Sequence, residues 1–249
     1  MSLYVWYIIN RREKQQKTAS EIMDKKCVLV CAGQLHKEDS LLIEQYVRAG
    51  AYLVAVDGGF DYCHQMGLKP ELCLGDFDSL SESQKAGLWK EADSVRGAGR
   101  FCEIIKLPVE KDDTDTLAAL KLCLERGYRE FHIFGGCGGR LDHTIANIQC
   151  LLFLKREGSI GSMITGEESI FVLKDEAVCF PAETQGVLSL FALSGEAKGV
   201  SISGMKYNLE DAIITNNFPI GISNEFVGEE SNVVVREGEL LVVVNKKSG

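Results

Sequence analysis

The chain has 249 residues, of which 45% are hydrophobic and 25% are charged, so it carries enough apolar side chains for one large core or two smaller ones. This composition argues against a disordered chain. The formal net charge of −9 at pH 7 repels polyanions, and the sequence shows no local basic face for nucleic acid or an anionic membrane surface. We therefore expect no nucleic-acid partner, whereas small anions can bind where a metal ion or backbone N–H groups neutralise them.

The nine cysteines form no C-x-x-C pair, and most of them lie inside apolar runs, where a thiol behaves as a small hydrophobic group. An odd number of cysteines with no regular spacing favours a reduced, cytoplasmic protein over a secreted protein that is held together by disulfides. It also gives no support for a zinc site.

Residues 1–26 are expected to form an N-terminal extension. Its apolar run, 3–9, has seven residues and is too short to span a bilayer. Basic residues follow this run instead of preceding it, which does not fit a signal peptide. We therefore expect no stable membrane association, and attachment to a membrane through this run is the weaker alternative.

From residue 27 onward, short apolar runs alternate with amphipathic stretches, which is typical of a parallel sheet covered by helices. The expected order is strand 27–32, helix 40–49, strand 52–56, helix 60–66, strand 71–74, helix 81–92, strand 102–107, a helix ending at 126, strand 131–134 and helix 142–154. The sequence therefore predicts an α/β domain with a parallel sheet over residues 27–157.

Beyond residue 158 the sequence pattern changes, and the segments become rich in Val, Ile, Ser and Gly. Strands are predicted at 169–173, 187–193, 199–203, 232–235 and 240–245. Because no helical pattern separates these strands, they predict a smaller antiparallel, all-β, sandwich-like domain over residues 158–249.

Four motifs each follow a predicted strand of the α/β domain. In an open parallel sheet, ligands bind outside the carboxyl ends of the strands, so we expect the motifs to meet at one edge. They are Asp57-Gly58-Gly59, Gly75-Asp76-Phe77-Asp78-Ser79, the segment 111–116 and the segment 135–143.

The acidic residues of these motifs are candidates for a metal site. Asp76 and Asp78 lie two residues apart, so in a turn both carboxylates can face one divalent cation, and Asp57 and Asp115 would complete the shell. Carboxylates beside a phosphate site would repel the substrate without a cation, and Mg²⁺ prefers a few carboxylates together with water and phosphate oxygens.

Each acidic residue also has a purely structural interpretation. Asp76 or Ser79 would form turn hydrogen bonds or cap the next helix. Asp112, Asp113 and Asp115 would complement the positive end of the helix that follows them. Any one motif alone fits this interpretation, and the argument for a site rests on their common position.

The glycine-rich segment 135–139 resembles a phosphate cradle, because closely spaced glycines let backbone N–H groups approach an anion in front of a helix. No lysine follows the glycines, so it is not a P-loop, and it does not fit G-x-G-x-x-G. Arg140 would bind a phosphate in a bidentate manner, with Asp142 or His143 fixing it from behind. The alternative is a plain helix entry with no ligand.

Together the motifs resemble the thiamine pyrophosphokinase family, and the likeness extends from residue 27 to the end of the chain. The segment 221–225, Gly-Ile-Ser-Asn-Glu, is similar to the segment with which that family contacts thiamine. The residues that match the four motifs are Asp57, Gly58, Gly59, Gly75, Asp76, Phe77, Asp78, Ser79, Lys111, Asp112, Thr114, Asp115, Gly135, Gly136, Gly138, Gly139, Arg140, Asp142 and His143.

The resemblance implies Mg²⁺-dependent transfer of a diphosphate group from ATP to thiamine, giving thiamine diphosphate and AMP. It implies that Asp57, Asp76, Asp78 and Asp115 hold or surround the metal and the triphosphate. Of these, Asp76, Asp78 and Asp115 are the candidate catalytic residues, and either Asp76 or Asp115 would take the proton of the hydroxyl. The residues implied on the nucleotide side are Asp57, Gly58, Gly59, Ser79, Lys111, Asp112, Thr114, Gly135, Gly136, Gly138, Gly139, Arg140, Asp142 and His143.

On the thiamine side, the resemblance implies that Ser223 and Asn224 face the aminopyrimidine ring. It also implies a homodimer in which domains of both subunits build each site. Two other functions remain open at this point: a pyrophosphokinase for another hydroxymethyl heterocycle, such as a pterin, and a regulatory protein that binds a nucleotide without turnover.

Overall fold

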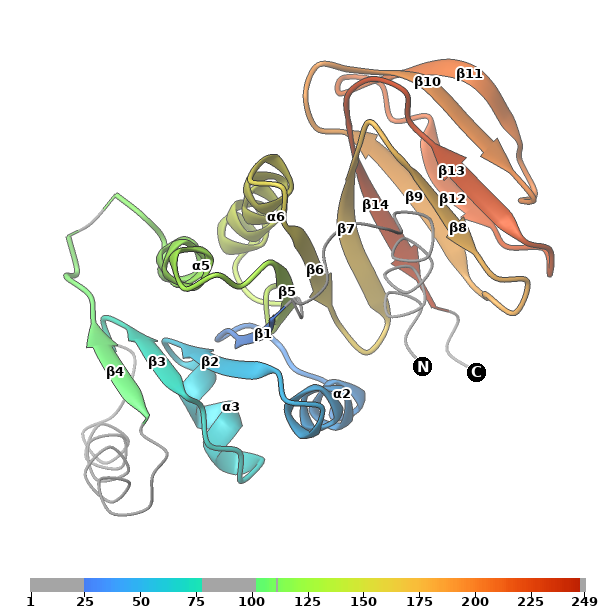
Figure 1. Ribbon diagram of the computed structural model, residues 1–249. Coiled ribbons are helices and arrows are strands. Elements are labelled where there is room, and N and C mark those ends of the chain that lie inside the picture. Colours follow the sequence, from blue (N-terminus) through green and yellow to red (C-terminus); the bar gives the residue numbers. More distant parts are fainter. Residues whose placement is uncertain (1–24, 78–101, 111, 247–249) are drawn as a thin grey trace, which may run out of the picture. The chain divides into compact units, whose positions relative to one another are not determined.

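The computed structural model describes residues 25–77, 102–110 and 112–246, and these form two compact units (Figure 1). The first unit ends at Gly166 and the second begins at Glu167. The predicted helix 81–92 and most of the expected extension 1–26 lie outside the described residues. No helix in the described part of the chain is long and apolar enough to cross a membrane.

The first unit contains a parallel sheet in the order β6-β5-β1-β2-β3-β4. Strand β1 lies between β2 and β5, so the chain order reverses beside it. Ligands bind at such a switch point in open α/β sheets. The strands are β1 (Lys26–Val30), β2 (Tyr52–Val56), β3 (Leu72–Gly75), β4 (Glu103–Lys106), β5 (Glu130–Phe134) and β6 (Ile160–Ile164).

Helices cover both faces of this sheet, as Figure 1 shows. Cys27 of β1 lies with its Sγ 3.7 Å from the Sγ of Cys123 in α5. The neighbouring register position, Val28 opposite His132, faces the other way, and there the ring of His132 stacks on Tyr46 of α2. Helices α2 and α5 therefore pack on opposite faces. The helices are α2 (Lys37–Arg48), α3 (Gly59–Gln65), α5 (Asp115–Glu125) and α6 (Leu141–Arg156).

Apart from helix 81–92, which lies outside the described residues, the predicted strands and helices of this unit are present within a few residues, with two differences. Helix α2 begins at Lys37, three residues earlier than predicted, because the His36 N–H donates to the Asp39 carboxylate at 2.7 Å and closes the first turn. Strand β6 was not predicted, since Gly161 and Ser162 interrupt its apolar run. It pairs in parallel with β5, so the α/β unit reaches Gly166 and not the expected residue 157.

The second unit consists of two antiparallel sheets, in the orders β12-β9-β14-β7 and β11-β10-β13-β8. All five strands predicted here are present. Strands β8, β11 and β12 were not predicted, because β8 is short, β11 is mostly exposed and β12 contains an irregularity between Gly221 and Asn224 that breaks the period of two. The strands are β7 (Glu168–Lys174), β8 (Ala177–Phe180), β9 (Val187–Ala192), β10 (Glu196–Ser203), β11 (Leu209–Thr215), β12 (Gly221–Glu225), β13 (Ser231–Val234) and β14 (Glu239–Asn245).

Strand β5 carries two buried ionisable side chains in the core of the first unit. His132 is fully buried, with Nδ1 3.0 Å from the Ser162 hydroxyl and Nε2 3.0 Å from the Glu130 carboxylate. The Lys26 ammonium lies 2.9 Å from the same carboxylate. Burial lowers the pKa of His132 despite the opposing effect of Glu130. Burial also opposes ionisation of Glu130, but hydrogen bonds from His132 and Lys26 leave its pKa below the ordinary value.

Acidification is expected to destabilise the chain through His132. Because the native state keeps this imidazole neutral, the unfolded chain binds more protons below about pH 6.5, and stability rises with pH in that range. The free energy of unfolding of the wild-type chain should fall between pH 7 and pH 5, and in His132→Gln this loss should be smaller by up to about 2 kcal/mol. Urea titrations at the two pH values measure this loss.

The matched control is His64→Gln, which replaces an exposed histidine of α3 and should leave the loss unchanged. Equal losses in the wild-type chain and the His132→Gln variant would contradict the prediction.

Candidate functional site

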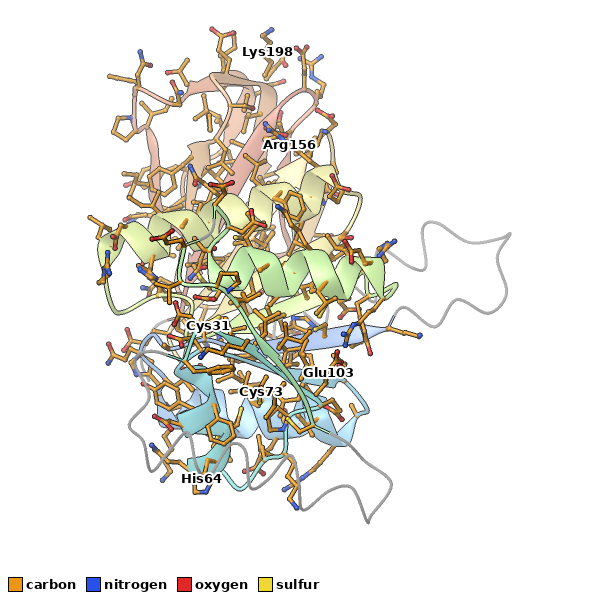
Figure 2. All side chains as sticks on the ribbon, turned by 90° about the vertical axis from the view of Figure 1, so that its left-hand side faces the viewer. Cys31, His64, Cys73, Glu103, Arg156 and Lys198 are labelled. Atoms are coloured by element: carbon orange, nitrogen blue, oxygen red, sulfur yellow. The ribbon has the colours of Figure 1, made fainter. Side chains whose placement is uncertain are left out.

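A cavity of about 400 Å³ opens at the carboxyl ends of β1, β2 and β5. Cys31, which directly follows β1 and is labelled in Figure 2, lies in its wall. The wall also includes the first turns of α5 and α6. The lining residues are Cys31, Ala32, Gly33, Val56, Asp57, Val109, Asp113, Thr114, Asp115, Thr116, Gly135, Gly136, Cys137, Gly139, Arg140, His143, Thr144, Ala146 and Asn147.

The loop after β1 and the glycine-rich loop after β5 are hydrogen-bonded to each other. The Gly33 N–H donates to the Gly135 carbonyl and the Gln34 N–H to the Cys137 carbonyl, both at 2.9 Å. A Cβ at Gly33 would lie 2.4 Å from the Gly135 oxygen and 2.5 Å from the Cys137 oxygen, so only glycine permits this approach. Gly135 itself has a φ of 63°, in the left-handed region. These two loops form one rigid wall of the cavity.

Two helix N-termini meet the cavity. Helix α5 begins with Thr114 as its cap, whose hydroxyl accepts the Leu117 N–H at 3.2 Å. Helix α6 begins at Leu141, directly after the glycine-rich loop, and its cap residue Arg140 makes no side-chain capping bond. The unsatisfied N–H groups at such ends carry partial positive charge, so this part of the wall favours an anion.

Two of the four predicted metal-binding carboxylates, Asp57 and Asp115, line the cavity. Asp57 follows β2 with a φ of 48°, a left-handed conformation that is uncommon outside glycine and is often found at functional sites. Asp115 is the first residue of α5. Burial raises the pKa of the Cys31 thiol to about 12, and the charges of Asp115 and Asp57 add to this rise. Cys31 is therefore not a nucleophile at neutral pH.

Asp76 lies at the same edge of the sheet but does not line the cavity. It follows β3, and the Asp57 N–H donates to the Leu74 carbonyl at 2.9 Å, which holds the ends of β2 and β3 together. Asp78 lies outside the described residues. Within the described ranges, no three His, Cys, Asp or Glu side chains are grouped to hold a metal ion. Of the four carboxylates predicted to hold a metal ion, Asp57 and Asp115 therefore lie in the cavity wall. Asp76 follows the neighbouring strand and is close to them in the fold.

Arg140 is fixed by a two-pronged ion pair. Its Nε lies 3.1 Å and its Nη2 2.5 Å from the two oxygens of Asp142, and the His143 N–H donates to the same carboxylate. This hydrogen bonding raises the pKa of Arg140 and lowers that of Asp142. Asp142 uses two of the five N–H donors of the guanidinium, so three remain. Both Arg140 and His143 line the cavity. The predicted pairing of Arg140 with Asp142 is confirmed, and the phosphate contact remains a prediction.

Several other predicted site residues do not line the cavity. Gly58 caps α3 and Gly59 is its first residue, while Gly138 belongs to the glycine-rich loop. Asp112 is exposed, but its neighbour Asp113 lines the cavity and pairs with Lys121 at 2.7 Å. Ser79 and Lys111 lie outside the described residues. Gly135, Gly136, Gly139 and Thr114 line the cavity as predicted.

In the second unit, Ser223 and Asn224 lie on β12 with opposite surroundings. Ser223 is exposed with a φ of 57°. Asn224 is buried, and its amide is used on both sides by the main chain of Tyr207: its oxygen accepts the Tyr207 N–H at 3.0 Å and its nitrogen donates to the Tyr207 carbonyl at 2.6 Å. The ring of Tyr207 is 63% exposed, so Asn224 presents an aromatic side chain to the surroundings.

Sequence reasoning missed three parts of these sites. The loop 31–34 follows a predicted strand just as the other motifs do, and this position was the signal that could have identified it. Asn147 lies one helical turn after His143, on the same face of α6, so the spacing pointed to it. For Tyr207 there was no local signal, since its link to Asn224 joins two segments 17 residues apart.

Two family models match the chain. The model described as "Thiamin pyrophosphokinase, catalytic domain" matches residues 43–160, and "Thiamin pyrophosphokinase, vitamin B1 binding domain" matches residues 175–241. The thiamine pyrophosphokinase of Bacillus subtilis (strain 168) is 28% identical over 200 residues, which cover 76% of this chain and 85% of that protein. Thiamin pyrophosphokinase 1 of Caenorhabditis elegans is 23% identical over 227 residues, covering 82% and 84%.

Solved structures share the fold. The crystal structure of the thiamine pyrophosphokinase from Bacillus subtilis superposes with a TM-score of 0.77 at 24% identity, covering 90% of this chain and 100% of that one. The yeast thiamin pyrophosphokinase gives a TM-score of 0.73 at 17% identity, covering 90% and 87%. At these identities the superposition establishes the common fold.

Proposed function

Because this chain belongs to the thiamin pyrophosphokinase family and is a thiamine diphosphokinase, we propose which of its residues carry the reaction. The enzyme transfers a diphosphate group from ATP to the hydroxyl of thiamine, which gives thiamine diphosphate and AMP. One observation carries the proposal: two helix N-termini, a glycine-rich loop and the carboxylates of Asp57 and Asp115 line the same cavity of about 400 Å³.

The triphosphate of ATP binds along the glycine-rich loop and the first turns of α5 and α6. Backbone N–H groups and the positive helix ends attract the triphosphate, which the net charge of −9 would repel. Arg140 contributes a fixed guanidinium, since Asp142 holds its fork in one plane and leaves donors for a phosphate oxygen. His143 lies on the same wall and shapes the nucleotide side of the cavity.

Mg²⁺ is the cation that we propose for this site, held by Asp57, Asp115, Asp76 and Asp78. The donor set fits, because Asp57 and Asp115 in the wall offer only oxygen ligands, which this hard cation prefers. A triphosphate beside unneutralised carboxylates would be repelled. When bound, the cation supplies positive charge that neutralises the phosphate oxygens.

The reaction depends mainly on positioning and charge. The oxygen of the thiamine hydroxyl forms a bond to the β-phosphorus while the bond from that phosphorus to the oxygen shared with the α-phosphate breaks, and AMP leaves with the electron pair. Asp115 or Asp76 accepts the hydroxyl proton, although a loose transition state needs little help from a base. The N–H groups of the cavity wall stabilise the oxygens that carry the developing charge.

The thiamine site forms around Ser223 and Tyr207 of the second unit. Ser223 offers an exposed hydroxyl, and Tyr207 offers an exposed ring whose face attracts cations such as the thiazolium of thiamine. The Lys206 ammonium already lies 5.7 Å from the centre of this ring, held there by Glu225 at 2.8 Å. We assign Asn224 to holding Tyr207 in place and not to a direct contact with thiamine, since its amide is bonded to the Tyr207 main chain.

We further propose a cytoplasmic homodimer in which units of both subunits build each site. Support comes from large apolar side chains that are at least half exposed on and beside β11 and β12, a density that is unusual on a free surface. All nine cysteines are free thiols, as a reducing compartment requires. The exposed residues are Ile213, Phe218, Ile220 and Ile222.

The function is tested by mixing the protein with ATP, Mg²⁺ and thiamine and following AMP and thiamine diphosphate by chromatography. We expect AMP in equal amount to thiamine diphosphate, and none when thiamine is left out. Replacing thiamine by a hydroxymethyl pterin should give no AMP. AMP release that does not depend on thiamine would contradict the proposed site.

In the same assay, Asp57→Asn and Asp115→Asn should each lower kcat/KM by about 100-fold or more, because each removes a negative charge that holds the cation. Asparagine tolerates the left-handed conformation at position 57, so the backbone should be retained. The matched control is Asp113→Asn at the same helix end, whose carboxylate is paired with Lys121, and we expect a change of less than about threefold. Near-normal activity of both variants at saturating Mg²⁺ would contradict the assignment.

Changing Tyr207→Ala should raise the KM for thiamine by about tenfold and leave the KM for ATP within about twofold, because the ring contributes stacking and cation attraction to only one substrate. Ser223→Ala should act in the same direction with a smaller effect. Val227→Ala, at a half-exposed position of the same unit, is the control and should change neither constant. Equal effects on both substrates would refute the placement of thiamine.

Shared sites predict complementation, at thiamine concentrations well below its KM, between two variants that are impaired in different units. If Asp115→Asn and the double variant Tyr207→Ala with Ser223→Ala are unfolded, mixed and refolded together, half of the dimers are mixed and each of these has one intact site. About a quarter of the wild-type activity should therefore return. Light scattering should show twice the mass of one chain. No recovery from mixed dimers would show that each chain builds its own site.

A further inference from the structure

Three consecutive carbonyl groups of the glycine-rich loop are held by donors from two different elements. The Gly135 carbonyl accepts the Gly33 N–H and the Cys137 carbonyl accepts the Gln34 N–H, both from the loop after β1. Between them, the Gly136 carbonyl accepts the side-chain amide of Asn147 at 2.7 Å. Asn147 is thus the one side chain in this series of three bonds, and only its bond can be removed without changing the backbone of a loop.

The position of Asn147 fits a dedicated role. It lies in the second turn of α6, only 6% exposed, and it lines the same cavity as the glycine-rich loop. A buried amide without partners is costly, so its hydrogen bond to Gly136 also accounts for the presence of a polar side chain here. Neither metal binding nor the contacts proposed above use this residue.

The direction of the Gly136 carbonyl matters because the peptide bond is planar and trans. With the oxygen drawn toward Asn147, the N–H of the same peptide group, that of Cys137, points the opposite way. Rotation of this peptide group changes ψ of Gly136 and φ of Cys137, and glycine at 136 removes the side chain that would oppose the first of these changes. A rotated peptide would turn a carbonyl oxygen, with its partial negative charge, toward the place where we put the triphosphate. The side chain of Asn147 opposes that rotation.

We propose that Asn147 is a positioning residue for the triphosphate of ATP, acting through the peptide group between Gly136 and Cys137. The inference rests on the proposed nucleotide site and deepens it. Asn147 does not contact the reacting atoms. It keeps the Gly136 carbonyl oxygen turned away from the anion, as the Gly33 and Gln34 N–H groups do for the two neighbouring carbonyl oxygens, so that the loop binds phosphate through its N–H groups without prior rearrangement.

The test compares Asn147→Leu, which has nearly the same size without a donor, with Asn147→Ser, which leaves room for a water. Asn147→Leu should raise the KM for ATP about tenfold, the effect of losing one hydrogen bond to a carbonyl that then stays buried, and Asn147→Ser should raise it less, because a water can replace the lost donor. The KM for thiamine should remain within about twofold. The dissociation constant for an unreactive ATP analogue with Mg²⁺, measured by calorimetry, should rise by the same factor as the KM for ATP.

Ser231→Ala is the matched control for a lost structural hydrogen bond. The Ser231 hydroxyl is buried in the second unit and donates to the Gly204 carbonyl at 2.7 Å, the same length as the Asn147 bond. Its loss should lower the melting temperature by an amount similar to the loss in the Asn147 variants and leave both KM values unchanged.

An unchanged KM for ATP in folded Asn147→Leu and Asn147→Ser overturns the proposal, and so does an equal rise of both KM values. Failure of both variants to fold also overturns it, because Asn147 would then serve the packing of α6 alone. The wild-type assay with thiamine separates these outcomes from failure of the nucleotide site itself, since that assay contains no altered residue.

Discussion

The site depends on a set of backbone hydrogen bonds that join two crossover loops at the carboxyl edge of the parallel sheet. Strands β1 and β5 pair in register from Lys26 to Val30, and this pairing continues past their ends, where Cys31 donates to the Phe134 carbonyl at 2.8 Å. Gly33 then brings its loop against the next carbonyls, an approach that any side chain would prevent. The loops are therefore extensions of the sheet, and this explains how segments rich in glycine keep one conformation.

This rigidity matters for an enzyme with a net charge of −9 that binds a highly charged anion. Attraction has to come from groups of fixed direction, since mobile dipoles would lose free energy on becoming ordered. The cavity provides helix N-termini, loop N–H groups and one guanidinium held by Asp142. Asp57 and Asp115 lie among these groups and suit a cation between protein and phosphate. In the proposed assignment, the wall combines donors for the anion with ligands for its counter-ion.

In the second unit, hydrogen bonds likewise fix the position of an exposed group. Asn224 binds both polar groups of the Tyr207 main chain, so a buried amide holds an exposed ring in place. In the first unit, Asn147 holds the Gly136 carbonyl from α6. In both units a short polar side chain fixes the backbone of a segment that offers little packing of its own. In the proposed sites, the side chains assigned to the substrate and the amides that fix the neighbouring backbone are therefore different residues.

The sequence by itself determined the class of fold, the order of most elements and the edge at which the motifs meet, because strand periodicity, caps and loop position are local properties. It also indicated Asp57, Asp115 and Arg140, since each directly follows a strand or opens a helix. Tertiary structure decided that β6 belongs to the parallel sheet, and that Asn224 is bonded to Tyr207 and not exposed beside Ser223. Such facts depend on which groups from distant segments become neighbours, and hydrogen bonds of this kind leave no trace in local spacing or hydrophobic pattern.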